Sequence, residues 1–451
     1  MRVRRLSTTA GQKHTLEPSS AAQGPERRKS PHDGRLLRFV LLVILLSIPA
    51  IPAVFRLLGH TSPGTQMQQL GIFWHVQQGT DSWLPMLGSL AYFHAHPDVP
   101  IYSVKLYDTL IYSLVSLLPL DLLEKLGLHG QAMLRFLAWT SWLAVWAMGA
   151  VAALLASKLL KREGGKLSAV ALCAIFLAVV FFYPIIKGYG LGQAQTFLSL
   201  LFGVLLYLWT TGREKSSGVV VAALAMVKPQ FVLILLWMAV RRRWGAFWSG
   251  MLFAAIMFAI SIAVFGWRNN LDYLPVLASL SHKAQSHYAN QSLFGTLNRM
   301  VFNGENLDYH PYVYSPYIAW IYRTTVLSSL AMLALALFYP WGSYRASTAD
   351  LAAMGITSVA ASPMAWEHHY GIVFPIFAWV WFGHGCWEQR RPWLLGLAFF
   401  LCSTYLTPTK LLAPIPVLNI LQSYLYFGAL LLLFLLYRMP WAERRGRLLV
   451  V

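Results

Sequence analysis

An acidic residue near the start of the chain is the first candidate for chemistry. Asp81 stands in the segment FWHVQQGTDSWLPM and is the first acidic residue beyond an apolar run at about 36–58. A carboxylate at a membrane surface can accept a proton from a hydroxyl group and so act as a general base. From position alone, an ordinary solvated loop acid fits Asp81 equally well.

A lysine inside a long apolar stretch is the second candidate. Lys228 and Pro229 interrupt the otherwise apolar residues 216–240. An ammonium group at membrane depth needs a partner, and phosphate suits it because lysine binds phosphate as a point charge. A structural pair with a distant acid is the alternative, but no acid lies close in the sequence. We therefore favour a phosphate-binding role.

Two glutamines follow a glycine-rich segment. In KGYGLGQAQTFLSL, residues 187–200, the glycines predict a tight turn between two membrane spans. Gln193 and Gln195 then enter an apolar helix, where polar side chains are costly unless they are paired. The two glutamines either pair with neighbouring helices or face a substrate.

A third polar segment, SHYANQSLFGTLNRM at residues 286–300, is dense in amides. Asn290 and Gln291 could bond sugar hydroxyls, and Arg299 could bind a phosphate. A turn and helix start whose polar groups satisfy one another is the alternative.

The last candidates are Glu367, His368 and His369, in ASPMAWEHHYGIVFP at the entry to an apolar run. Adjacent histidines do not share one face of a helix, and the HExxH zinc pattern is absent from this segment. This segment therefore predicts no metal site. We also expect the protein to use no cofactor. The three residues either form part of a substrate site or serve the fold.

The elements that must position these residues are membrane helices. The chain is 57% hydrophobic and 12% charged, whereas a soluble domain carries about 25% charged residues. Lipid must therefore cover much of the surface, which predicts an all-α, polytopic integral membrane bundle of roughly 10–13 membrane segments. Apolar runs of spanning length lie at about 36–58, 131–157, 167–186, 192–211, 244–266, 317–340, 369–386 and 418–437.

The net charge of +19 reflects an excess of basic residues. Where these residues lie along the chain predicts which parts face the cytoplasm. In a membrane protein such an excess marks the cytoplasmic side and does not indicate nucleic acid binding. We expect residues 1–35 to be a disordered basic cytoplasmic tail, 36–438 the membrane domain and 439–451 a short basic cytoplasmic tail. The long loops predicted on the outer face are about 59–130 and 267–316.

Two apolar segments are predicted not to cross. Basic residues flank 216–240 on both sides, and Pro229 breaks a helix near its middle. We read this segment as a hairpin of two short helices that carries Lys228 into the membrane from the cytoplasm; one kinked span is the alternative. We read 106–120 as a partly embedded segment of the outer face.

Taken in order, these segments resemble glycosyltransferase family 87, a family of bacterial polytopic transferases with GT-C-type architecture. The resemblance includes the early loop acid Asp81 and the Gly192-Gln193-Ala194-Gln195 segment. It continues through AMVKPQFVLILLWMAVRRRW, NQSLFGTLNR and SPMAWEHH. The chain departs from the family where Gln195 replaces a usual asparagine and where an aromatic-Pro-Pro element is missing from the first loop. That second departure leaves Asp98 and Asp108 as alternatives to Asp81 for the base.

The resemblance implies an inverting transfer of a hexose, mannose above all, from a polyprenyl-phosphate donor to a lipid or glycan acceptor. It implies Asp81 as the catalytic base and contact of the donor phosphate with Lys228, Arg299, His368 and His369. Substrate contacts are expected from Gln193, Gln195, Asn290, Gln291 and Glu367. We expect the enzyme in the cell inner (plasma) membrane, with both termini cytoplasmic and the site on the extracytoplasmic face.

Two other functional classes stay open at this point. A polyprenyl-linked glycan ligase or polymerase would transfer a whole chain from a diphosphate donor. A lipid or solute transporter would also carry polar residues in broken membrane helices, although it would be expected to show inverted repeats, and we find none in this sequence.

Overall fold

A computed structural model describes residues 33–57, 59, 66–103, 110–162, 164–282, 285–310, 313–342, 345–383 and 392–448. The regular elements in these ranges are all helices, and one isolated antiparallel bridge joins Asn290 to Trp366. The all-α prediction is therefore confirmed. The predicted N-terminal tail, up to residue 32, and Asp108 lie outside the described residues.

Several helices are long and apolar enough to cross a membrane. Within the described ranges, five continuous helical segments pass this test, and one bent pair of helices adds a sixth. The chain is thus a polytopic membrane protein, as predicted. The five are Gly34–Leu57 (α1 Asp33–Leu45, η1 Leu46–Ala50 and α2 Ile51–Leu57), α6 Gly130–Arg162, α12 Trp244–Phe265, α16 Ala319–Phe338 and Pro416–Met439 (η9 Pro416–Ser423 with most of α20 Tyr424–Leu448).

Shorter apolar helices fill the interior between these spans. Every residue of α17, Thr348–Ala360, is buried, as are Val373–Phe382 of α18, Val373–Gly383. A helix that is apolar on all sides is stable where it is surrounded by other helices. Helix α9, Gln195–Thr210, is also largely buried, whereas α19, Pro392–Ser403, buries one side and exposes Trp393 and Leu397 on the other.

The predicted span at 167–186 is bent in the structure. Helix α7, Ala169–Val180, and helix α8, Tyr183–Leu191, meet at an angle of 48°. The chain stays helical through Gly188 and Gly190 and turns at Gly192, whose φ is +71°. A single glycine in the left-handed region therefore makes the turn that we had predicted from all three.

The segment around Lys228 is a hairpin, as predicted. Helix α10, Glu214–Val227, ends at Lys228, and the chain returns through η4, Pro229–Phe231, and α11, Val232–Val240. Arg243, just beyond α11, forms an ion pair of 2.8 Å with Glu214 at the start of α10. Both ends of the segment thus lie together, and the alternative of one kinked span is wrong.

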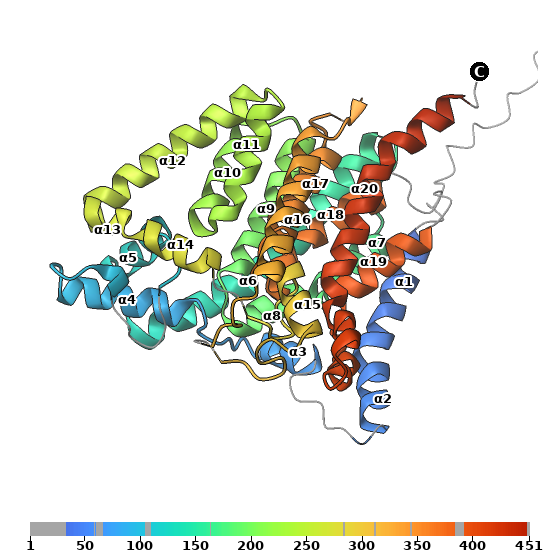
Figure 1. Cartoon of the computed structure of the whole chain (residues 1–451). Helices are drawn as coiled ribbons and strands as arrows, with labels where there is room; N and C mark the ends of the chain where they lie inside the picture. The colour runs from blue at the N-terminus through green and yellow to red at the C-terminus, as the bar shows by residue number, and fades with distance from the viewer. Residues whose placement is uncertain are drawn as a thin grey trace, which may run out of the picture. The chain divides into compact units, whose positions relative to one another are not determined.

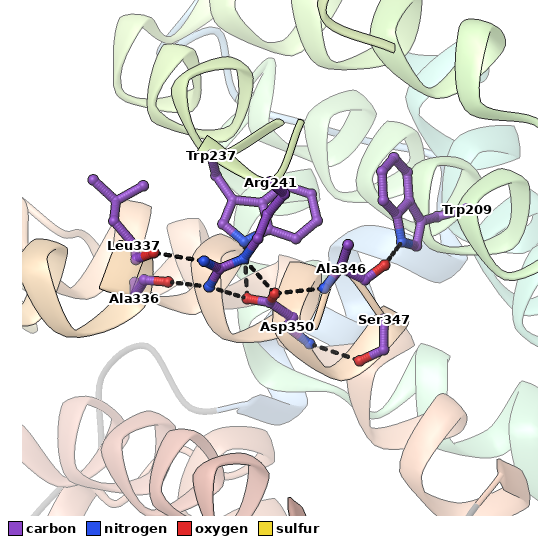
Figure 2. A network of polar contacts seen from close by, with 8 residues as sticks. All are labelled: Trp209, Trp237, Arg241, Ala336, Leu337, Ala346, Ser347 and Asp350. Atoms are coloured by element: carbon purple, nitrogen blue, oxygen red, sulfur yellow. Dashed lines mark hydrogen bonds and ion pairs between the residues drawn. The ribbon is translucent and has the colours of Figure 1, made fainter. Parts of the chain in front are cut away.

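A buried polar network fixes the base of this hairpin (Figure 2). The Arg241 guanidinium forms an ion pair with Asp350 at the start of α17, with an Nε to Oδ2 distance of 2.6 Å. It also donates to the carbonyls of Ala336 and Leu337 on α16. Trp237 donates to the same carboxylate at 2.8 Å. The network joins α11, α16 and α17 at the end of the hairpin opposite to Lys228.

The connecting segments hold shorter helices that gather at one end of the bundle (Figure 1). The start of α1 and the end of α20 point toward the other end, and α20 continues helically through the predicted C-terminal tail to Leu448. The remaining helices are α3 Gln66–Trp74, α4 Trp83–Ala95, η2 Ile101–Ser103, η3 Leu114–Leu117, α5 Leu118–Lys125, α13 Trp267–Leu271, α14 Tyr273–His282, α15 Leu293–Met300, η6 Glu367–Ile372 and η8 Thr407–Leu412.

Candidate active site

The loop that carries Asp81 is bound along its backbone to the turn after α8. Gly79 N–H donates to the carbonyl of Gly190 at 2.9 Å, and Asp81 N–H donates to that of Leu191 at 3.0 Å. This pairing requires glycine, because a Cβ on Gly192 would lie 1.9 Å from the carbonyl oxygen of Gly79. The glycines of the KGYGLG segment thus allow the backbone of the Asp81 loop to approach the backbone of the turn after α8.

Side chains then orient the Asp81 carboxylate. The amide of Gln193 donates to its Oδ2 atom. The orientation of that amide is fixed in turn, because Ser82 Oγ donates to Gln193 Oε1 at 2.9 Å. Tyr112 bonds to Ser82 at 2.6 Å from the far side of the loop. Asp81 itself is exposed, so a base held in this way stays accessible to a substrate.

Lys228 and His369 meet beside this carboxylate. The Lys228 ammonium, at the tip of the hairpin, hydrogen-bonds to Nε2 of His369 on η6. It is also close enough to Asp81 to interact with its charge. The His368 ring packs edge-on against His369, with ring centroids 4.7 Å apart. Residues from four distant parts of the sequence therefore form one site, which we call the Asp81–Lys228 site.

The bond from Lys228 decides where the proton of His369 lies. Because Nε2 accepts from the ammonium, the neutral imidazole carries its proton on Nδ1. Within the described part of the chain that Nδ1 atom is buried and has no hydrogen-bond partner. An unsatisfied buried donor is costly, and it can bond an anion that enters the site. Gln195 contributes by donating to the backbone carbonyl of His369 at 3.4 Å.

Asn290 and Gln291 join the loop before α15 to neighbouring segments of the chain. Asn290 donates to the carbonyl of Gln285 at 2.8 Å and accepts from the backbone N–H of Ala365 at 3.1 Å. Gln291 donates to two carbonyls, those of Tyr288 and Gln422. Both amides are fully buried and are used within the protein, so their expected contact with substrate stays a prediction.

Arg299 also bonds mainly to its own loop. Its Nη1 atom donates to the carbonyls of Ser286, His287 and Asn290 at 3.0 to 3.2 Å, and Nη2 donates to Ser423 at 2.5 Å. The side chain is 1% exposed. Arg299 thus organises the loop, and its Nε is the atom left without a partner among the described residues. A contact of Arg299 with the donor phosphate stays a prediction.

The sequence comparison decides the family. The profile of glycosyltransferase family 87 matches residues 111–363, which is more than half of the chain. The chain belongs to glycosyltransferase family 87. This membership, together with the membrane helices, confirms the predicted resemblance and makes the protein a membrane glycosyltransferase. No curated protein and no solved structure matches the chain.

The matched part of the glycosyltransferase holds half of the candidate site. Gln193 and Lys228 lie inside residues 111–363, whereas Asp81 and His369 lie outside them. The geometry supplies the connection, because Gln193 bonds to Asp81 and Lys228 bonds to His369.

Two residues of the glycosyltransferase site were missed from the sequence. Ser82 and Tyr112 hold Gln193 in place, but a serine and a tyrosine in a long loop carry no distinctive pattern. The alternative base Asp98 lies beyond α4 from Asp81. A helix of 13 residues separates its ends by about 20 Å, so Asp98 is remote from Lys228.

The turn at Gly192 gives a first prediction for the glycosyltransferase. We expect Gly192→Ala to lower transfer by about tenfold or more, because the added Cβ clashes with Gly79 and displaces the base; misplacements of this kind typically cost about 10²-fold. Initial rates of sugar transfer measure the effect. Gly212→Ala is the matched control, since Gly212 also has positive φ but nothing within 4 Å of the added carbon. Equal losses in the two variants would contradict the role of the close approach.

Proposed function

We propose that this glycosyltransferase moves a hexose, with mannose as the expected sugar, from a polyprenyl-phosphate donor to a lipid or glycan acceptor. The transfer takes place in a GT-C-type bundle on the extracytoplasmic face of the inner (plasma) membrane and inverts the anomeric centre. The observation that carries the proposal is the Asp81–Lys228 site. It sets an accessible carboxylate beside an ammonium and an imidazole N–H that has no partner among the residues the structure describes.

The proposed reaction is a single displacement. The acceptor hydroxyl oxygen forms a bond to the anomeric carbon while its proton passes to a carboxylate oxygen of Asp81. The bond between that carbon and the phosphate oxygen breaks, and the polyprenyl phosphate leaves with the electron pair. Attack from the side opposite to the leaving group inverts the configuration, as inverting sugar transfers do.

The cations of the site are suited to the leaving phosphate. A lysine ammonium has three donors, of which one bonds His369. The other two, with Nδ1–H of His369, can bond the negative charge that grows on the phosphate. The His368 ring packs against that of His369, and we propose that His368 lines the same phosphate position. Gln193 acts through Asp81 and is a positioning residue.

The test of the proposed function is transfer by the purified protein in detergent. Polyprenyl-phosphate mannose carrying a radiolabelled sugar serves as donor, and a membrane-lipid extract serves as acceptor. Polyprenyl-phosphate glucose and a polyprenyl-diphosphate-linked mannose run in parallel. Labelled product from the monophosphate mannose donor is expected. Product from the diphosphate donor alone would contradict the proposal and favour a ligase or polymerase.

Lys228 gives a second prediction. We expect Lys228→Gln to lower turnover by about 10²–10³-fold, because the ammonium stabilises charge that develops as the phosphate leaves. Single-turnover rates with a saturating donor measure this effect. Lys215→Gln is the matched control, since Lys215 is exposed at the opposite end of the same helix. Turnover of Lys228→Gln within about twofold of that control would exclude the role in phosphate stabilisation.

A further inference from the structure

A lysine next to the Asp81–Lys228 site has no assigned role so far. Lys187 lies half-buried on α8 between buried neighbours. Its ammonium makes no hydrogen bond or ion pair with any residue that the structure describes, although it interacts electrostatically with Glu367 and His368. A charged group that is partly withdrawn from water without a partner is costly. Lys187 is therefore poised to meet an anion.

A second lysine faces the same region from the far end of the chain. Lys410 Nζ on η8 lies 3.8 Å from the centroid of the Tyr288 ring and 5.6 Å from that of Tyr405. The two tyrosine hydroxyls bond each other at 3.1 Å. Lys410 is close enough to Lys187 for the two charges to repel. The cation–π contact stabilises the position of the Lys410 ammonium. It leaves the N–H groups of that ammonium able to donate to a ligand.

Both lysines interact electrostatically with a buried acid, Glu367, that has an unused oxygen. Glu367 accepts from Tyr183 through Oε2 at 2.8 Å, and Tyr183 stacks on Tyr405 with centroids 4.8 Å apart. The other oxygen, Oε1, is buried without a partner among the described residues, in a side chain that is 1% exposed. A buried acceptor of this kind lacks a donor, and a ligand hydroxyl would supply one.

Positive charge exceeds negative charge among the groups that act on Glu367 and on Lys410. Arg299 acts on Glu367 as well, but its Nη donors are already bonded to loop carbonyls and Ser423. His287 adds no charge, because burial lowers its pKa to about 3. Asp308 acts on Lys410 without forming an ion pair with it. A ligand that combines an anionic group with hydroxyls fits this set.

The subsite adjoins the proposed chemistry through His368, on which both Lys187 and Lys228 act. We propose that Lys187, Lys410 and Glu367 form a subsite for the acceptor, and that the acceptor carries a phosphate or carboxylate. Lys187 and Lys410 bind the anionic group, and Oε1 of Glu367 accepts from a sugar hydroxyl. The inference rests on the proposed transferase function and adds the chemical class of the acceptor.

The experiment separates acceptor use from donor use. A membrane-lipid extract and an aqueous glycan fraction are each divided by anion exchange into neutral and anionic pools, and each pool is offered with labelled polyprenyl-phosphate mannose. Lys187→Gln and Lys410→Gln are compared with Lys125→Gln, a lysine that is 60% exposed on α5. Release of free mannose to water measures donor turnover without any acceptor.

Label is expected in an anionic pool, and the pool that carries it tells a lipid from a free glycan. The variants at Lys187 and Lys410 should lose about tenfold or more in kcat/KM for the acceptor, the size expected of a lost charged hydrogen bond. Donor hydrolysis should stay at the wild-type rate. Label confined to neutral pools, or a raised KM for the donor in these variants, would overturn the inference.

A binding measurement keeps the inference testable if no donor is turned over. Native mass spectrometry of the full chain compares retention of phosphatidylglycerol, as an anionic probe, with that of a neutral diacylglycerol. Selective retention that falls in both lysine variants supports the subsite, even if the transferase assay contradicts the proposed function. Equal retention by wild type and both variants overturns it.

Discussion

Replacing Asp81 with asparagine is expected to lower sugar transfer by about 10²–10⁴-fold, the usual cost of losing a general base. Asparagine keeps the size of the side chain and can still bond to Gln193, whose amide now holds the carboxylate. The loop should keep its place, because its backbone pairs with Gly190 and Leu191. Initial rates with labelled donor measure the loss, and a thermal melt in detergent should be unchanged.

Asp98→Asn is the matched control for this experiment. Asp98 belongs to the same loop but stands beyond α4 from Asp81. Its rate should lie near that of the wild type. If Asp98→Asn is inactive while Asp81→Asn is active, the assignment of the base fails. Gln193→Leu refines the test, since loss of a residue that positions the carboxylate should lower kcat and leave the KM for the donor near that of the wild type.

The largest effect on stability is expected at the ion pair below the hairpin. Asp350→Asn should lower the free energy of unfolding by about 3–5 kcal/mol, because removing one partner of a buried pair leaves the other charge uncompensated. The side chains of Arg241 and Asp350 are 4% and 0% exposed. Denaturation in mixed detergent micelles, followed by tryptophan fluorescence, measures the change.

A double replacement separates charge from packing in this network. Arg241→Met with Asp350→Leu removes both charges and keeps apolar volume, so it should recover a large part of the lost stability. Arg243→Gln is the exposed control: the Arg243 and Glu214 side chains are 40% and 36% exposed, and surface pairs contribute about 1 kcal/mol or less. An Asp350→Asn protein as stable as this control would contradict the buried pair's role.

The membrane fold was largely predictable from the sequence because the pattern is simple. Too few charges and repeated apolar runs specify a helical bundle, and basic residues at both ends of 216–240 specify a hairpin, which the Glu214–Arg243 pair confirms. Lys228 stood out for the same reason, because it is a charged residue in an apolar segment, 216–240, that contains no acidic residue. These signals are local, and they depend on the cost of charge in lipid.

Contacts between distant segments were not predictable in this way. Nothing in the spacing of Gln193 and Asp81 indicates their bond across 112 positions, and nothing near Lys187 indicates Lys410 or Glu367. Polar residues were recognised as costly in apolar surroundings, but the sequence could not distinguish internal bonding from substrate binding. Asn290 illustrates this limit, because its amide bonds to backbone on both of its sides.

The hairpin has a consequence for the parity of the membrane crossings. Because α10 and α11 return to the side from which they start, the pair brings Lys228 to the site without changing the sidedness of any later helix. The hairpin can therefore place Lys228 in the site without affecting the side of the membrane on which the later helices begin and end. Reporter domains inserted after Gly212 and after Arg243 should report the same compartment.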